Sequence, residues 1–202
     1  MATFTAPIPS RSRFSTELHV ALAPDATFRH LMASRSYVHG WRALRRPAMV
    51  LLMISVLAPI MAVERVTIAL VATAALSWCF VLAIQTLVAV GVIASAPARR
   101  VPLAAALDLW FAGHLPYSLW MLVAFGVMAE SQSGPLRLFV SAAVVPAVWT
   151  AIIVASFCRT VLGTTAFGAC WRTAVHVIGV WAIALSYIAW AAGGWFQLLP
   201  PR

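Results

Sequence analysis

The chain has 202 residues, of which 63% are hydrophobic and 9% charged, and its mean hydropathy is +0.94. A soluble domain is closer to half apolar and a quarter charged, so the composition excludes an ordinary soluble globule and predicts an integral membrane protein. The net charge of +9 comes from 14 arginines and five acids, without lysine, and such a charge can indicate nucleic-acid binding. Because the arginines gather in the N-terminal segment and between apolar runs, we expect them to face anionic lipid headgroups, and we exclude nucleic acid as the main partner.

Residues 1–46 form an Arg-rich arm before the first apolar run. Phe14, Leu18 and Leu22 recur every four residues, which predicts a short amphipathic helix. An aromatic and basic belt, typical of a membrane interface, leads into the first run. The residues of this belt, expected to contact lipid or a partner, are Trp41, Arg42, Arg45 and Arg46. The arm is therefore expected to lie on the membrane as an anchor, with partner docking as the alternative.

Five apolar runs reach, or nearly reach, the roughly 20 helical residues that cross a hydrocarbon core of about 30 Å. They cover residues 47–63, 66–96, 106–129, 136–157 and 173–196. Only Glu64 and Arg65 carry charge between the first two runs, which predicts an antiparallel hairpin. The expected fold class is all-α: an integral membrane bundle of five transmembrane helices over 47–202, with interfacial amphipathic segments. A four-span alternative leaves run 106–129 without a crossing.

The arginines also predict the orientation of the chain. With the N-terminus in the cytoplasm, eleven of the 14 arginines lie inside and three outside, a strong positive-inside bias. The three outside are Arg65, Arg137 and Arg202. Heavy use of Ala and Arg without Lys is typical of bacteria, so we expect a bacterial inner membrane and a periplasmic C-terminus.

Asp108 is the one acid in or near the interior of an apolar run, and an ionisable residue inside a membrane is a functional candidate. Its expected partners are the arginines predicted at the same end of the bundle, Arg99, Arg100 and Arg172. The favoured interpretation is a solvated carboxylate near a helix N-terminus, where the helix dipole stabilises its charge.

Pro116 and Gly113 predict a bend in the same run, where an interfacial helix turns into a span. His114, between them, lies at a predicted depth similar to that of His176 in the last run. Two facing imidazoles can hold a haem iron, and one can ligate a chlorophyll-type magnesium. The favoured interpretation is that both histidines are interfacial and bond to lipid or backbone. No cofactor is therefore expected, with haem or a chlorophyll-type pigment as the alternative.

Motifs for chemistry are missing from the sequence. It has no nucleophile elbow, no phosphate-binding loop and no metal-spaced histidine motif, so we expect no catalytic residues, no metal site and no enzyme activity. Cys79, Cys158 and Cys170 form no C-x-x-C pair and predict neither a disulfide framework nor a zinc site.

The segments RRVPLAAALDLWFAGH at 99–114 and RTVLGTTAFG at 159–168 each precede a later span. With the cytoplasmic N-terminus and five spans, this layout over residues 40–196 resembles Yip-domain membrane proteins. The resemblance implies membrane organisation and partner binding without a defined chemistry, and it carries over no functional residue.

The expected function is therefore that of a non-catalytic accessory, scaffolding or assembly subunit. Its partners would be membrane lipids and other integral membrane subunits. Two alternatives stay open: a cofactor-bearing subunit of an electron-transfer or light-harvesting assembly, with His114 and His176 as ligands, and a small-solute carrier.

Overall fold

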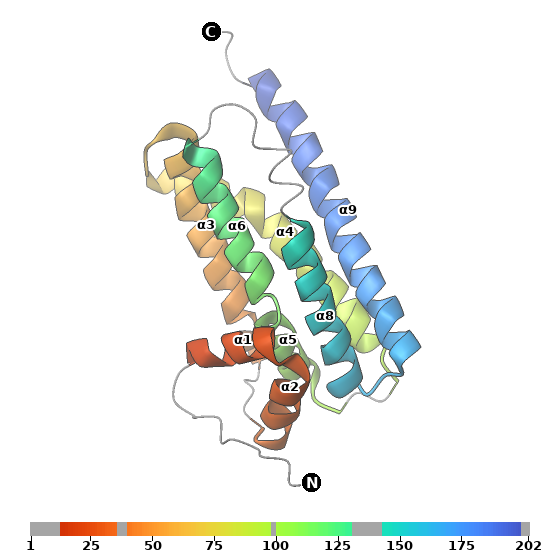
Figure 1. Ribbon diagram of the computed structural model, residues 1–202. Coiled ribbons are helices and arrows are strands. Elements are labelled where there is room, and N and C mark those ends of the chain that lie inside the picture. The colour runs from red at the N-terminus through yellow and green to blue at the C-terminus, as the bar shows by residue number, and fades with distance from the viewer. Residues whose placement is uncertain (1–12, 36–39, 98–99, 131–142, 199–202) are drawn as a thin grey trace.

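The computed structural model describes residues 13–35, 40–97, 100–130 and 143–198, and the secondary structure within these ranges is helical throughout. The long helices α3 (Arg45–Val63), α4 (Ile68–Ala94), α6 (Leu115–Glu130), α8 (Val144–Thr160) and α9 (Ala166–Leu198) run side by side (Figure 1). The short helices α1 (Arg13–Leu22), α2 (Pro24–Ala33) and α5 (Leu103–Ala112) gather at one end of this bundle, and η1 (Gly40–Leu44) leads into α3. The all-α class is confirmed for the described residues.

The predicted hairpin of the first two runs is confirmed. Glu64 ends α3 in a left-handed conformation, with φ of 55°, and its N–H donates to the carbonyl of Ile60 at 2.9 Å. Thr67 then begins α4 as an N-cap whose hydroxyl accepts from the N–H of Leu70 at 3.2 Å. Two capped ends three residues apart turn the chain back on itself.

The run 106–129 is divided into two helices, as the glycine and proline predict. The N–H groups of Gly113 and His114 donate to carbonyls three residues back, at 3.0 and 3.2 Å, and close α5. A β-carbon at Gly113 would lie 2.7 Å from Cγ2 of Ile153, so the glycine lets the bend approach α8 closely. Pro116 is the second residue of α6, where its missing N–H costs no helical hydrogen bond, so it begins a helix and does not kink one.

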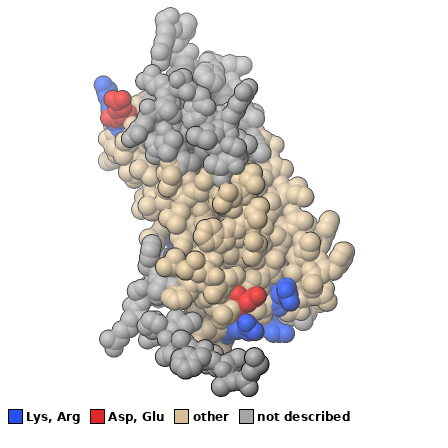
Figure 2. Space-filling model, in the orientation of Figure 1, with Lys and Arg blue, Asp and Glu red and all other residues tan. Residues whose placement is uncertain are grey.

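Three of the described helical stretches are long and apolar enough to cross a membrane: Gly40–Ile60, Ile68–Ala94 and Ala166–Ile183. This supports a membrane-embedded protein. On the face in Figure 2, the charged side chains lie toward the two ends of the molecule and a band of uncharged residues separates them. The two ends of this face therefore have the polarity of headgroup regions and the band that of a hydrocarbon core.

The arm packs into the core of the bundle. Phe28 of α2 is fully buried and meets Phe157 of α8 edge to face, with ring centroids 5.6 Å apart. Phe157 in turn meets Trp110 of α5 at 5.3 Å. Leu18 and Leu22 of the predicted amphipathic helix face outward, with exposed fractions of 47% and 68%. The core therefore continues across the predicted boundary at residue 46, while the leucines of α1 stay available to a membrane surface.

Candidate functional site

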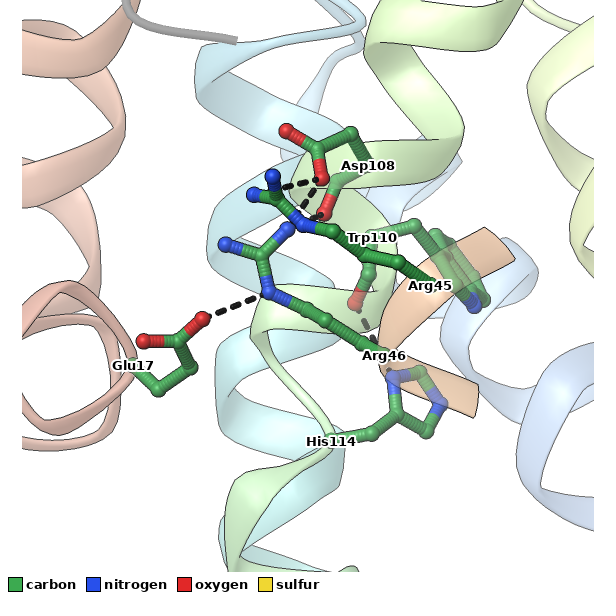
Figure 3. A network of polar contacts seen from close by, with 6 residues as sticks. All are labelled: Glu17, Arg45, Arg46, Asp108, Trp110 and His114. Carbon is green, nitrogen blue, oxygen red and sulfur yellow. Dashed lines mark hydrogen bonds and ion pairs between the residues drawn. The ribbon is translucent and has the colours of Figure 1, made fainter. Parts of the chain in front are cut away.

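Four charged residues form a network that we name the polar latch: Glu17, Arg45, Arg46 and Asp108 (Figure 3). Arg46 Nη1 donates to the Asp108 carboxylate, and also to the Asp108 backbone carbonyl at 3.1 Å. Arg46 Nε donates to Glu17 Oε1 at 2.6 Å, and Arg45 Nη2 lies 3.6 Å from Asp108 Oδ1. The latch therefore ties α1 of the arm and the start of α3 to the middle of α5.

The burial of the latch makes its pairing important for stability. The exposed fraction of the side chain is 3% for Asp108, 15% for Arg46 and 18% for Glu17. A buried charge without a partner costs several kcal/mol, whereas a paired and hydrogen-bonded one is tolerated. Two cations and two anions balance, so the latch adds no net charge to the interior.

The latch corrects two expectations for Asp108. The predicted partners Arg100 and Arg172 lie elsewhere: Arg172 Nη2 donates to the Ser95 carbonyl at 2.6 Å, and Arg100 lies against Gly163. Arg99 is outside the described residues. A solvated carboxylate at a helix N-terminus is also wrong, because Asp108 is the sixth residue of α5 and is buried.

The interfacial belt divides into two groups. Trp41 has an exposed fraction of 81% and Arg42 is also exposed, as expected for lipid or partner contact. Arg45 and Arg46 instead pair with Asp108, and the Arg45 side chain keeps an exposed fraction of 26%, so their expected contact with lipid or a partner stays a prediction. Sequence reasoning missed Glu17, which lies 29 residues before Arg46 in a different helix and carries no local sequence signal for this contact.

His114 and His176 are brought together, as their similar predicted depths allow. Their Nε2 atoms are 3.3 Å apart and their rings meet edge to face, with exposed fractions of 8% and 4%. The burial differs from the favoured view of interfacial histidines that bond to lipid, while the backbone bond that this view allowed is present for His114, whose Nδ1 lies 2.9 Å from the Trp110 carbonyl oxygen. The contact joins the turn between α5 and α6 to α9.

Hydrogen bonding assigns the proton positions of the neutral pair. His114 Nδ1 lies 2.9 Å from the Trp110 carbonyl, which can only accept, so Nδ1 of His114 carries the proton. His114 Nε2 is then an acceptor, and His176 Nε2 donates to it. His176 Nδ1 is left as a buried acceptor without a partner among the described residues, and Thr150 Oγ1 is likewise unpartnered.

Two small cavities adjoin this pair. One of about 70 Å³ lies between α3, α4 and α6 and reaches from Arg46 to His114, Tyr117 and Gln85. The other, of about 20 Å³, is lined by the same Gln85, His114 and Tyr117 together with Thr150 and His176. Because one water needs about 10–15 Å³, the second cavity is large enough for a water that bonds His176 and Thr150.

This geometry does not fit a tetrapyrrole between the two rings. Metal–imidazole bonds are about 2.0–2.1 Å long, so two axial ligands lie about 4 Å apart with the macrocycle between them. The histidine rings here are in direct contact, and cavities of 70 and 20 Å³ are too small for such a ring. Within the described residues, no group of three His, Cys, Asp or Glu side chains is arranged to hold a metal ion.

Comparisons with protein-family models, curated proteins and solved structures find no match to this chain. The resemblance to Yip-domain proteins therefore stays a prediction. The latch, the histidine pair and the outer surface are the features of the described residues that bear on function.

Proposed function

We propose that the chain crosses a bacterial inner membrane five times, with its N-terminus in the cytoplasm. Two arginines that we place on the cytoplasmic side contact residues at one common end of the bundle. Arg46 contacts α5, and Arg172 contacts Ser95 at the end of α4. Glu64 and Arg65 belong to the turn at the other end of α3. With 16 and 17 residues, α6 and α8 are about 24 and 26 Å long, which a modest thinning of the bilayer accommodates.

In this membrane the protein acts as a non-catalytic accessory or assembly subunit. The observation that carries this proposal is that its buried charges pair with one another inside the bundle. Asp108 is neutralised by Arg45 and Arg46, and the adjoining cavities are too small for a solute path. Because the buried charges are paired and the adjoining cavities are small, the surface on which this bundle would bind a partner is its outer one.

The outer surface offers continuous apolar stripes. On α9, Phe167, Trp171 and Ile178 have exposed fractions of 85%, 64% and 67%, and their helical spacing places them on one face. On α4, Leu76 and Leu87 are 77% and 66% exposed. These stripes would pack against lipid and against the helices of another subunit.

Photo-crosslinking in native membranes tests the proposal. A photoreactive phenylalanine analogue is placed in turn at Leu76, Leu87 and Ile178, with the buried Ile93 as the matched control. An accessory subunit predicts a discrete adduct with another polypeptide from at least one exposed position, and none from Ile93. Adducts with lipid alone at every exposed position would contradict the proposal.

The second candidate function is a carrier of protons or a small polar solute, and the unpartnered His176 Nδ1 favours it. The hydrogen-bonded series from the Trp110 carbonyl through His114 to His176 ends at a cavity that also holds Thr150 Oγ1, which has no hydrogen-bond partner among the described residues. Buried histidines in such chains serve as proton relays in membrane proteins. Proteoliposomes with an internal pH dye test it: a proton flux lost in His176→Phe supports the carrier, and a flux equal to that of empty liposomes contradicts it.

A further inference from the structure

Three arginines converge on a cavity outside the latch and the histidine pair. The cavity measures about 350 Å³ and lies between α2, the residues before α5 and the end of α8. Arg29, Arg100 and Arg159 line it from these three parts of the chain, and Asp25 is the one acid among the described lining residues. The formal charge of these described lining side chains is therefore three minus one, or +2.

The positive charge of this arginine pocket is largely uncompensated by the chain itself. Ser156 Oγ already donates to Asp25 Oδ1, at 2.5 Å. Arg29 Nε donates only to a backbone carbonyl, that of Asp25, at 3.1 Å. Within the described residues, the structure shows no hydrogen bond or ion pair for the guanidinium groups of Arg100 and Arg159. These two groups are left with their donors free for a ligand.

The turn after α8 shapes the pocket around Arg100. Gly163 has φ of 67°, and a β-carbon there would lie 3.1 Å from Nε and 3.4 Å from Nη2 of Arg100. The missing side chain at residue 163 therefore makes the space that the Arg100 guanidinium occupies.

The hydroxyl groups of the pocket do not compete with the arginines as donors. Thr160 Oγ1 donates to the Ser156 carbonyl, and Thr164 Oγ1 donates to the Cys158 carbonyl at 2.8 Å. The N–H of Thr164 also donates to Cys158, at 3.1 Å, so the end of α8 is capped and its negative dipole end is partly covered. A ligand would be held by the guanidinium groups.

We propose that the arginine pocket binds a phosphate-bearing anion. Planar guanidinium groups match phosphate oxygens in pairs, and three of them around a cavity of net charge +2 favour a compact, multiply charged oxyanion over a carboxylate. The source is either the headgroup of an anionic phospholipid or a free phosphate. Basic pockets between helices at the cytoplasmic face commonly bind such headgroups.

The melting temperature of the purified full chain tests this site. In the first experiment, inorganic phosphate is titrated into the protein in detergent, and potassium chloride of equal ionic strength serves as the control. The second experiment compares nanodiscs of phosphatidylcholine with nanodiscs that also contain phosphatidylglycerol. Binding to the folded state raises the melting temperature with ligand concentration. A rise with phosphate supports a free phosphate as ligand, and a rise only with phosphatidylglycerol supports the headgroup.

Variants locate the effect. In Arg100→Gln/Arg159→Gln the ligand-dependent rise should vanish, because each arginine–phosphate contact corresponds to about tenfold in affinity or more. Gly163→Ala leaves the charge unchanged, crowds the Arg100 guanidinium and places a side chain at a left-handed φ of 67°, so it should also weaken binding. If the double variant fails to fold, Gly163→Ala is the variant that tests the site. Arg65→Gln removes one positive charge at the other end of the bundle, away from the pocket, and should keep the full rise.

The proposal is overturned if neither phosphate nor phosphatidylglycerol raises the melting temperature of the wild-type chain. It is equally overturned if the rise persists in both pocket variants, or if Arg65→Gln removes it. In the last two cases the response reflects total charge, without a defined site.

Discussion

Arg46 and Asp108 are 62 residues apart in sequence and pair inside the bundle, where Arg46 also donates to Glu17. One guanidinium thereby joins the arm, the start of α3 and α5. Arg46 is therefore the residue that joins the largest number of elements at this end of the bundle.

Substitution of Arg46 should destabilise the protein more than any other arginine change in its segment. In Arg46→Gln the Asp108 carboxylate stays buried and keeps the ion pair with Arg45, which lies 3.6 Å away. Removing one partner of a buried ion pair costs about 3–5 kcal/mol, and we expect the lower end because Arg45 remains. Thermal unfolding in detergent measures this, with the exposed Arg42→Gln as control. An equal, small effect of both substitutions would show that the latch does not stabilise the fold.

Substitution of Glu17 should increase local unfolding of α1 and leave the other helices unchanged. Glu17→Gln removes the charge that meets Arg46 Nε, while α2 stays anchored by Phe28. Hydrogen exchange of the α1 amides should speed up, and exchange of α3 and α8 should stay unchanged. The control is Glu64→Gln in the exposed turn at the other end of α3. Faster exchange throughout the bundle would contradict a local role.

Gly113 should tolerate no side chain. Gly113→Ala places a β-carbon 2.7 Å from Cγ2 of Ile153, and we expect a cost of about 1–3 kcal/mol. Gly91→Ala is the matched control: a β-carbon there meets nothing within 4 Å, so the change should be neutral or stabilise α4 by up to about 1 kcal/mol.

A double-mutant cycle identifies the cause of that cost. Ile153→Ala removes the methyl group that the Gly113→Ala side chain meets, so the double variant should be more stable than the sum of the single effects predicts. Strict additivity would mean that the bend between α5 and α6 is not held against α8 at this contact.

The histidine pair should show two different tautomers. The Trp110 carbonyl requires a proton on Nδ1 of His114, and His176 should carry its proton on Nε2. Nitrogen NMR of ¹⁵N-histidine-labelled protein, assigned with His114→Phe and His176→Phe, reads these states directly. The reverse assignment, or the shift of a metal-bound nitrogen, would contradict the arrangement.

Local features of the fold were predictable where single residues decide the chain path. Glu64 and Arg65 interrupt two apolar runs and mark the hairpin, and Gly113 with Pro116 marks the division between α5 and α6. The start of the last helix was less visible. It begins at Ala166, seven residues before the predicted run, since Thr165 accepts from the Gly168 N–H and the semi-polar residues that follow continue the helix.

The latch was not predictable, because an Arg pair before an apolar run is usually an interfacial anchor. Only tertiary packing brings Asp108 and Glu17 to it, across 62 and 29 residues of sequence. The contact between His114 and His176 was suggested only by their similar predicted depths in the membrane. Its closeness, which excludes a tetrapyrrole between the rings, depends on how the turn between α5 and α6 packs beside α9, and no sequence spacing encodes that packing.

Native mass spectrometry of complexes released directly from the source membrane tests the central claim, that this protein is an accessory subunit. An accessory subunit should be recovered as a species heavier than the 21.8 kDa chain that contains it in fixed ratio with at least one other membrane polypeptide. Recovery only as the free chain or as whole multiples of its mass would contradict the role of accessory subunit and favour a self-sufficient carrier.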